Sequence, residues 1–175
     1  MSEEFEYLSN HSSIKKFSDI RLQVRSDSPR KRIQLVETKL VRKTSILYER
    51  RTIQTPNDAV SLLRKVYEEF DREYLFALYL TARREPIAIE LISIGTLECT
   101  ILSPKDVIKT ALLCCAYGFI ICHNHPSGGE IVLSTEDINA TKRINEASKI
   151  MGLIMLDHLI ITDISYISLK ERGVF

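Results

Sequence analysis

Residues 52–175 alternate between apolar and polar blocks, and these blocks predict an ordered set of helices and strands. Three blocks begin with a Ser or Thr in an N-cap pattern and predict helices, over 55–70, 103–117 and 134–152. Short apolar runs bounded by polar turns predict strands, at 74–80, 86–94, 97–102, 118–123, 153–162 and 166–169. This order of elements predicts an α/β fold in which a mixed β-sheet is sandwiched by helices.

The first part of the chain lacks this pattern and carries a different charge. Residues 1–51 contain 12 Lys and Arg against 7 Asp and Glu, whereas residues 52–175 contain 12 against 16. The segment up to about residue 30 is polar and weakly periodic, and residues 33–41 alternate loosely, as an edge strand would. We therefore expect a basic, partly disordered N-terminal arm over 1–51 and a folded domain over 52–175.

The basic arm suggests one kind of partner. Its densest cluster, Ser28-Pro29-Arg30-Lys31-Arg32, has the charge to contact the phosphates of a nucleic acid. Short basic clusters are more often solvated surface, and the arm has no interleaved aromatic side chains on which bases would stack. The acidic balance of the domain argues against DNA binding there. Nucleic acid is thus a candidate partner of the arm alone.

Other features of the sequence indicate the cellular compartment of the protein. No apolar run approaches the length of a membrane span, and the acidic start of the chain differs from the basic start of a signal peptide. The four cysteines form no C-x-x-C pair and are typical of buried thiols. Cys122 should point away from His123 along a strand, so we exclude it as a ligand. These features predict a cytoplasmic protein without a membrane partner.

Two histidines carry the strongest chemical signal. His123 and His125 lie two residues apart at the end of the apolar run 118–121, so in a strand their side chains share one face. Asp137 follows twelve residues after His125, inside the start of a predicted helix. Two imidazole nitrogens and one carboxylate oxygen leave a fourth tetrahedral position for water, as catalytic zinc sites do. The pattern favours a zinc hydrolase.

Asp137 also fits a second interpretation. Ser134-x-x-Asp137 is a helix-capping pattern, in which the aspartate only complements the helix N-terminus. Both interpretations can hold, because Ser134 can begin the helix while Asp137, at its first turn, faces the ion.

A hydrolase of this kind also needs a carboxylate that takes a proton from water. Spacing alone does not choose among four candidates, which are Glu73, Glu90, Glu130 and Asp157. We interpret His158 as a core histidine satisfied by a hydrogen bond, and Asn124 as a residue that faces away from the histidine pair and braces the loop.

These residues carry a family resemblance. His123-x-His125-Pro126 followed by Ser134-x-x-Asp137 resembles the signature of the JAMM (MPN-domain) metalloproteases. A longer pattern resembles the RadC-like (JAB domain) branch of that family. It consists of the segment His-Asn-His-Pro-Ser-Gly together with residues 92–97 before it and residues 156–161 after it. The resemblance covers roughly residues 52–175 and implies the MPN fold, whose layout is similar to that of cytidine deaminases.

The resemblance also implies roles. It implies that His123, His125 and Asp137 bind Zn²⁺, that Glu73 is the base, and that Ser134 donates to the oxyanion or holds the water. The implied activity is that of a zinc-dependent metallopeptidase or isopeptidase acting on an amide bond of a peptide or isopeptide substrate. Two alternatives stay open, namely a noncatalytic MPN-type interaction module and a DNA-associated accessory protein of the RadC-like type.

Overall fold

The computed structural model describes residues 36, 38–66, 72–95, 102–125, 131 and 133–175. The chain divides into two units, Met1–Glu37 and Thr38–Phe175, and every helix and strand described below belongs to the second. The polar segment up to residue 30 and most of the predicted strand 97–102 lie outside the described residues. Val36 and residues 38–41 are not in a strand, so the predicted edge strand is wrong for them.

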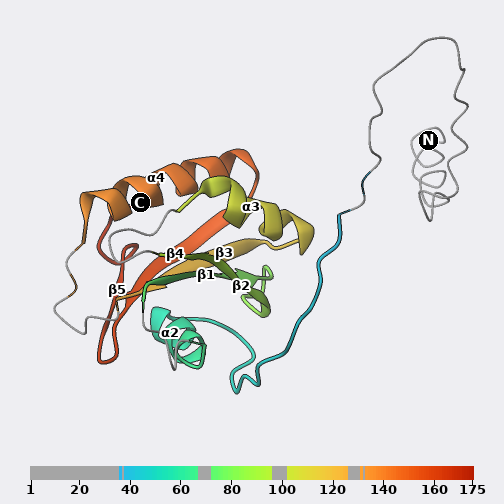
Figure 1. The fold of residues 1–175 in the computed structure, drawn as a ribbon, viewed down its shortest axis with the longest axis horizontal. Helices are drawn as coiled ribbons and strands as arrows, with labels where there is room; N and C mark the ends of the chain where they lie inside the picture. Colours follow the sequence, from blue (N-terminus) through green and yellow to red (C-terminus); the bar gives the residue numbers. More distant parts are fainter. Residues whose placement is uncertain (1–35, 37, 67–71, 96–101, 126–130, 132) are drawn as a thin grey trace, which may run out of the picture. The chain divides into compact units, whose positions relative to one another are not determined.

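A five-stranded mixed sheet forms the centre of the second unit (Figure 1). Its strands are β1 (Tyr74–Leu80), β2 (Pro86–Ile94), β3 (Gly118–Asn124), β4 (Ile154–Ile161) and β5 (Tyr166–Ser168). They lie in the order β2-β1-β3-β4-β5, and the pairing is antiparallel except between β3 and β4, which are parallel. The two hydrophobic runs 74–80 and 86–94 form the predicted hairpin.

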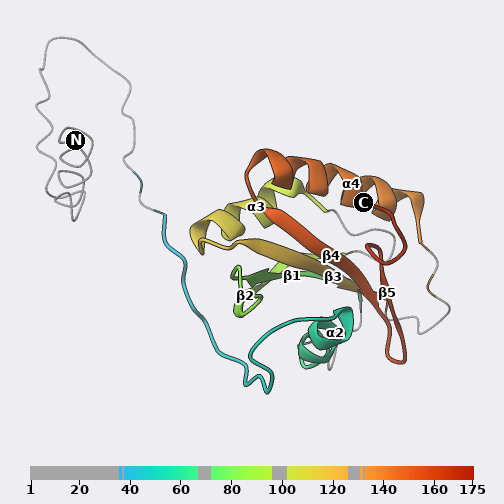
Figure 2. The ribbon, with the colours of Figure 1, turned by 180° about the vertical axis from the view of Figure 1, so that it is seen from behind.

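Helices cover both faces of this sheet. Figures 1 and 2 show α2 (Pro56–Arg64) on one face, and α3 (Pro104–Leu113) and α4 (Thr135–Ile150) on the other. Helix α4 is the crossover that parallel strands such as β3 and β4 require. The predicted α/β fold, a mixed sheet sandwiched by helices, is confirmed. None of the described helices is long and apolar enough to cross a membrane.

The helix starts match the sequence better than the helix ends do. Thr55 caps α2, as predicted, and it forms a capping box with Asp58, whose backbone N–H donates to the Thr55 hydroxyl over 3.3 Å. The sequence predicts that α3 reaches residue 117, but the helix ends at Leu113. Cys115 has a φ of 53°, a left-handed conformation that ends the helix. The backbone N–H of Tyr117 already donates to Leu80 at the end of β1.

Side chains of successive residues in the central strands point to opposite faces of the sheet and pack in two separate hydrophobic cores. The side toward α2, which we call the α2 face, includes Phe76, Leu78, Leu80, Ile120 and Cys122. The side toward α3 and α4, which we call the α4 face, includes Leu75, Ala77, Tyr79, Phe119 and Ile121. Cys122 therefore packs on the face opposite to that of its neighbour His123, as predicted.

Candidate functional site

The two histidines leave the carboxyl end of β3 on the α4 face. His123 is inside the strand and pairs with Leu75 of β1. The backbone N–H of His125 donates to the carbonyl of Ile161 over 2.9 Å, which extends the pairing with β4 by one residue. The Nε2 atoms of the two rings lie 3.2 Å apart. The i, i+2 spacing thus places both rings side by side, as the sequence predicted.

Asp137 reaches this pair from the first turn of α4. Ser134 is the N-cap, and its Oγ accepts a hydrogen bond from the backbone N–H of Asp137 over 3.0 Å. The same hydroxyl donates to Asp137 Oδ2 over 2.6 Å, while Oδ1 of that carboxylate lies 3.7 Å from His123 Nε2. The helix-capping interpretation is therefore confirmed, and it leaves Asp137 in a position compatible with the ligand interpretation. Ser134 begins the helix, and Asp137 faces the histidines.

The three side chains form a donor set that suits a divalent metal ion. One ligand atom from each of His123, His125 and Asp137 lies within 4.8 Å of the others. Burial lowers the pKa of His123 to about 4, although the nearby Asp137 and Glu73 oppose this shift. The ring is therefore neutral at neutral pH and offers a lone pair, which metal binding requires. Two imidazoles and one carboxylate fit zinc and neighbouring first-row metals.

Glu73 stands beside the donor set, just before β1. Its Oε1 lies 3.8 Å from His125 Nε2, and its side chain is 33% exposed. Asn124 holds the backbone on both sides of Glu73: its Nδ2 donates to the Arg72 carbonyl over 3.0 Å, and its Oδ1 accepts from the Tyr74 N–H over 2.7 Å. Asn124 thus faces away from the histidine rings, as predicted, and braces the start of β1.

The other candidate carboxylates have different surroundings. Glu90 on β2 accepts a hydrogen bond from the Tyr79 hydroxyl over 2.9 Å. Asp157 accepts from the Ser168 hydroxyl over 2.7 Å, and burial raises the pKa of its carboxyl group. Glu130 lies outside the described residues. Among the candidates that the structure describes, Glu73 is the one found next to the histidine pair.

Sequence reasoning placed His158 in the core with a hydrogen-bond partner but missed which partner it has. His158 is fully buried, and its Nε2 lies 3.0 Å from Nδ1 of His123. Its Nδ1 lies 2.6 Å from the hydroxyl oxygen of Thr141 on α4. Burial lowers the pKa of His158 well below its ordinary value. The sequence carries one signal that could have pointed to the role of His158. It is the polar pair Asp157-His158 inside the otherwise apolar strand that follows the crossover helix.

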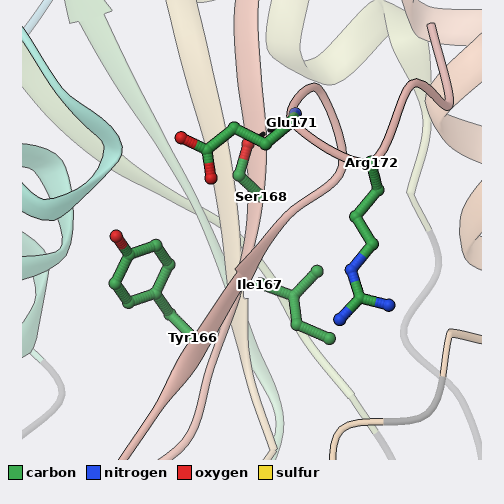
Figure 3. A pocket seen from close by; sticks show the side chains of 5 residues that line it. All are labelled: Tyr166, Ile167, Ser168, Glu171 and Arg172. Atoms are coloured by element: carbon green, nitrogen blue, oxygen red, sulfur yellow. Dashed lines mark hydrogen bonds between the residues drawn. The ribbon is translucent and has the colours of Figure 1, made fainter.

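A pocket of about 360 Å³ lies elsewhere on the domain. Its lining comes from β5 and the turn after it, and Figure 3 shows these side chains, which are Tyr166, Ile167, Ser168, Glu171 and Arg172. No residue of the donor set lines it. We therefore place the candidate site at the carboxyl end of β3 and the start of α4, where metal-binding side chains converge.

Comparison with known proteins finds relatives that match most of the chain. A UPF0758 protein of Methanococcoides burtonii is 41% identical over 153 residues, which cover 86% of this chain and 66% of the relative. A UPF0758 protein of Syntrophomonas wolfei is 44% identical over 129 residues, which cover 71% of this chain and 54% of the relative. The chain thus spans between about half and two thirds of the length of these relatives. A family model described as the RadC-like JAB domain matches residues 53–174, and the chain belongs to this family.

Proposed function

We propose that the domain is a zinc-dependent metallopeptidase or isopeptidase that hydrolyses an amide bond. The observation that carries the proposal is the convergence of His123, His125 and Asp137, whose ligand atoms lie within 4.8 Å of one another. A carboxylate stands at the same place, because Glu73 Oε1 lies 3.8 Å from His125 Nε2. Membership of the RadC-like JAB family supports the proposal, since the site falls inside the matched residues.

Each residue has a role that follows from its position. A zinc ion held by the three side chains would activate a water molecule and polarise the scissile carbonyl. Glu73, one third exposed at the edge of the site, accepts the proton of the attacking water and delivers it to the leaving nitrogen. Ser134 can turn its O–H from Asp137 Oδ2 toward the carbonyl oxygen as negative charge develops there.

The test separates metal binding from proton transfer. In the full chain, Glu73→Gln should keep the zinc content of the wild type, because Glu73 is not in the donor set. It should lose on the order of 10²–10⁴-fold in the rate of cleavage on a panel of peptides and isopeptide-linked peptides. Glu85→Gln is the matched control. Glu85 precedes β2 at the other end of the β1–β2 hairpin and pairs with Arg51 over 2.7 Å, so both zinc and cleavage should persist.

Four results would count against the proposal or redirect it. A wild-type chain that holds no zinc would refute it, as would cleavage that is unchanged in Glu73→Gln. Stoichiometric zinc, no cleavage across the panel and tight binding of a partner protein would favour a noncatalytic MPN-type module. Salt-dependent DNA binding that disappears when residues 1–51 are removed would favour a DNA-associated accessory role.

A further inference from the structure

Two buried side chains outside the donor set connect His123 to helix α4. His123 Nδ1 lies 3.0 Å from His158 Nε2, and His158 Nδ1 lies 2.6 Å from Thr141 Oγ1. The Thr141 hydroxyl also lies 2.6 Å from the backbone carbonyl oxygen of Asp137, one helical turn earlier. His158 and Thr141 are fully buried and His123 is 4% exposed, so these bonds lie out of contact with bulk solvent. The connection therefore begins at one candidate ligand and ends on the backbone of another.

Elementary chemistry determines which atom donates and which accepts in each of these hydrogen bonds. A carbonyl oxygen only accepts, so the Thr141 hydroxyl must donate its single proton to Asp137. The hydroxyl oxygen of Thr141 then accepts from His158 Nδ1–H. A neutral imidazole carries one N–H, so His158 Nε2 is an acceptor, and His123 must donate to it from Nδ1. The lone pair of His123 is thereby left on Nε2, the atom that faces His125 and Asp137.

We propose that His158 and Thr141 are positioning residues that hold His123 in the tautomer with a free Nε2 lone pair and tie its ring to the start of α4. This inference rests on the proposed metal site. If the Thr141 acceptor is removed, His158 can move its proton to Nε2, and His123 must then accept at Nδ1 and carry its own proton on Nε2. That proton points into the donor set and has to be displaced before a metal ion can bind. Supporting partners of this kind contribute about 10- to 100-fold to metal affinity.

The first measurement needs no metal. Long-range ¹H–¹⁵N correlation of the imidazole nitrogens in the full, metal-free chain reports which nitrogen of each ring carries the proton. The wild type should show His123 and His158 protonated at Nδ1. Protonation of His123 at Nε2 in the wild type would overturn the proposal, even if no variant could be purified.

The second measurement uses Thr141→Val, which keeps the shape of the side chain and removes the hydroxyl. We expect its His123 ring to populate the Nε2–H tautomer and its zinc affinity, measured by competition with a chelator, to fall about 10- to 100-fold. Thr141→Ser restores a hydroxyl at the same position and should recover both the wild-type tautomer and most of the affinity. Wild-type affinity and tautomer in Thr141→Val would overturn the proposal.

The two measurements separate this inference from the proposed function. Zinc binding by the wild type together with an unchanged Thr141→Val would reject the positioning role and leave the metal site standing. A wild type that binds no zinc would reject the metal site. The tautomer of metal-free His123 would still decide whether His158 and Thr141 set its protonation.

Discussion

The two faces of the central sheet use the same strands for different purposes. On the α2 face, Phe76, Leu78 and Leu80 of β1, Ile120 and Cys122 of β3, and Leu159 and Ile161 of β4 pack in one core with the buried side of α2. On the α4 face, β3 begins with Phe119 and Ile121 in a second core and then continues into His123. Cys122 and His123 are neighbours with similar exposure, 0% and 4%, yet one packs in a core and the other faces a donor set.

Their difference shows that partners, and not burial, distinguish the site from the core. The α4 face changes character where the crossover helix begins, because α4 brings Ser134, Asp137 and Thr141 to the carboxyl end of β3. Ligand sites in α/β proteins commonly lie at the carboxyl ends of strands, since the loops and helix starts that follow converge there. The α2 face has no such convergence among the described residues and serves as a hydrophobic core. Four predictions test this division.

The largest effect is expected when substitutions at two adjacent residues, one on each face of the sheet, are compared. His123→Ala removes a ligand from the donor set and should abolish stoichiometric zinc in the purified full chain, as measured by elemental analysis. Cys122→Ala, the next residue on the α2 face, should retain zinc despite a modest loss of stability. Equal zinc content in His123→Ala and wild type would contradict the assignment.

A core substitution on the α2 face should lower the stability of the fold and leave zinc binding unchanged. Leu78 is fully buried there, and Leu78→Ala should lower the free energy of unfolding by about 2–5 kcal/mol through lost contacts and a cavity. The native fraction should keep its zinc affinity. Leu112→Ala on α3, where the side chain is 46% exposed, is the control and should change stability by less than about 0.5 kcal/mol. Urea unfolding of the metal-free proteins measures both, and equal losses would contradict the division.

Substitution of Asn124 tests whether this side chain holds the start of β1 beside the site. Asn124→Ala removes the side-chain hydrogen bonds to the Tyr74 N–H and the Arg72 carbonyl, each of which should contribute about 0.5–1.5 kcal/mol. Cleavage should fall because Glu73 loses its support on both sides, while zinc content should persist. Asn139→Ala, at an exposed position of α4, is the matched control and should alter neither. Wild-type stability and cleavage in Asn124→Ala would show that the bracing is unimportant.

The smallest effects concern pH, and two aspartates should respond in opposite directions. The backbone N–H of Thr55 holds the pKa of Asp58 below its ordinary value, with further help from Gln54 and Arg50. A lowered native pKa contributes stability above the ordinary pKa that is lost as pH falls through the native one. Between about pH 6 and about pH 3, Asp58→Asn should therefore lose less unfolding free energy than the wild type.

Asp157 provides the contrast, because burial raises its pKa. Its contribution to stability is present below the ordinary pKa of an aspartate and is lost as pH rises through the raised value. Asp157→Asn should therefore lose more unfolding free energy than the wild type over the same descent in pH. Urea midpoints at several pH values measure both variants, and shifts of the same sign would refute the pair of assignments.

Much of the fold follows from local patterns. The bounds predicted for β1 and β2 agree with the structure, since apolar runs bounded by a polar turn determine where a buried hairpin begins and ends. The capping signals before α2 and α4 also hold, because a cap is a contact between residues three apart in the chain. The end of α3 could not be predicted, because the apolar run continues past Cys115 and only the left-handed turn there separates helix from strand.

The sequence by itself determined that His123 and His125 share a face and that Ser134 begins a helix carrying Asp137, because both depend on spacing within one element. Spacing left four carboxylates open and the family resemblance implied Glu73, but only the tertiary structure put Glu73 beside the histidines and placed His158 and Thr141 behind His123. Those contacts join residues far apart in the chain, such as Thr141 and His158, which are 17 positions apart, and His123 and His158, which are 35 positions apart. They depend on the strand order and on the crossover that makes β3 and β4 parallel neighbours, which no local pattern of side chains specifies.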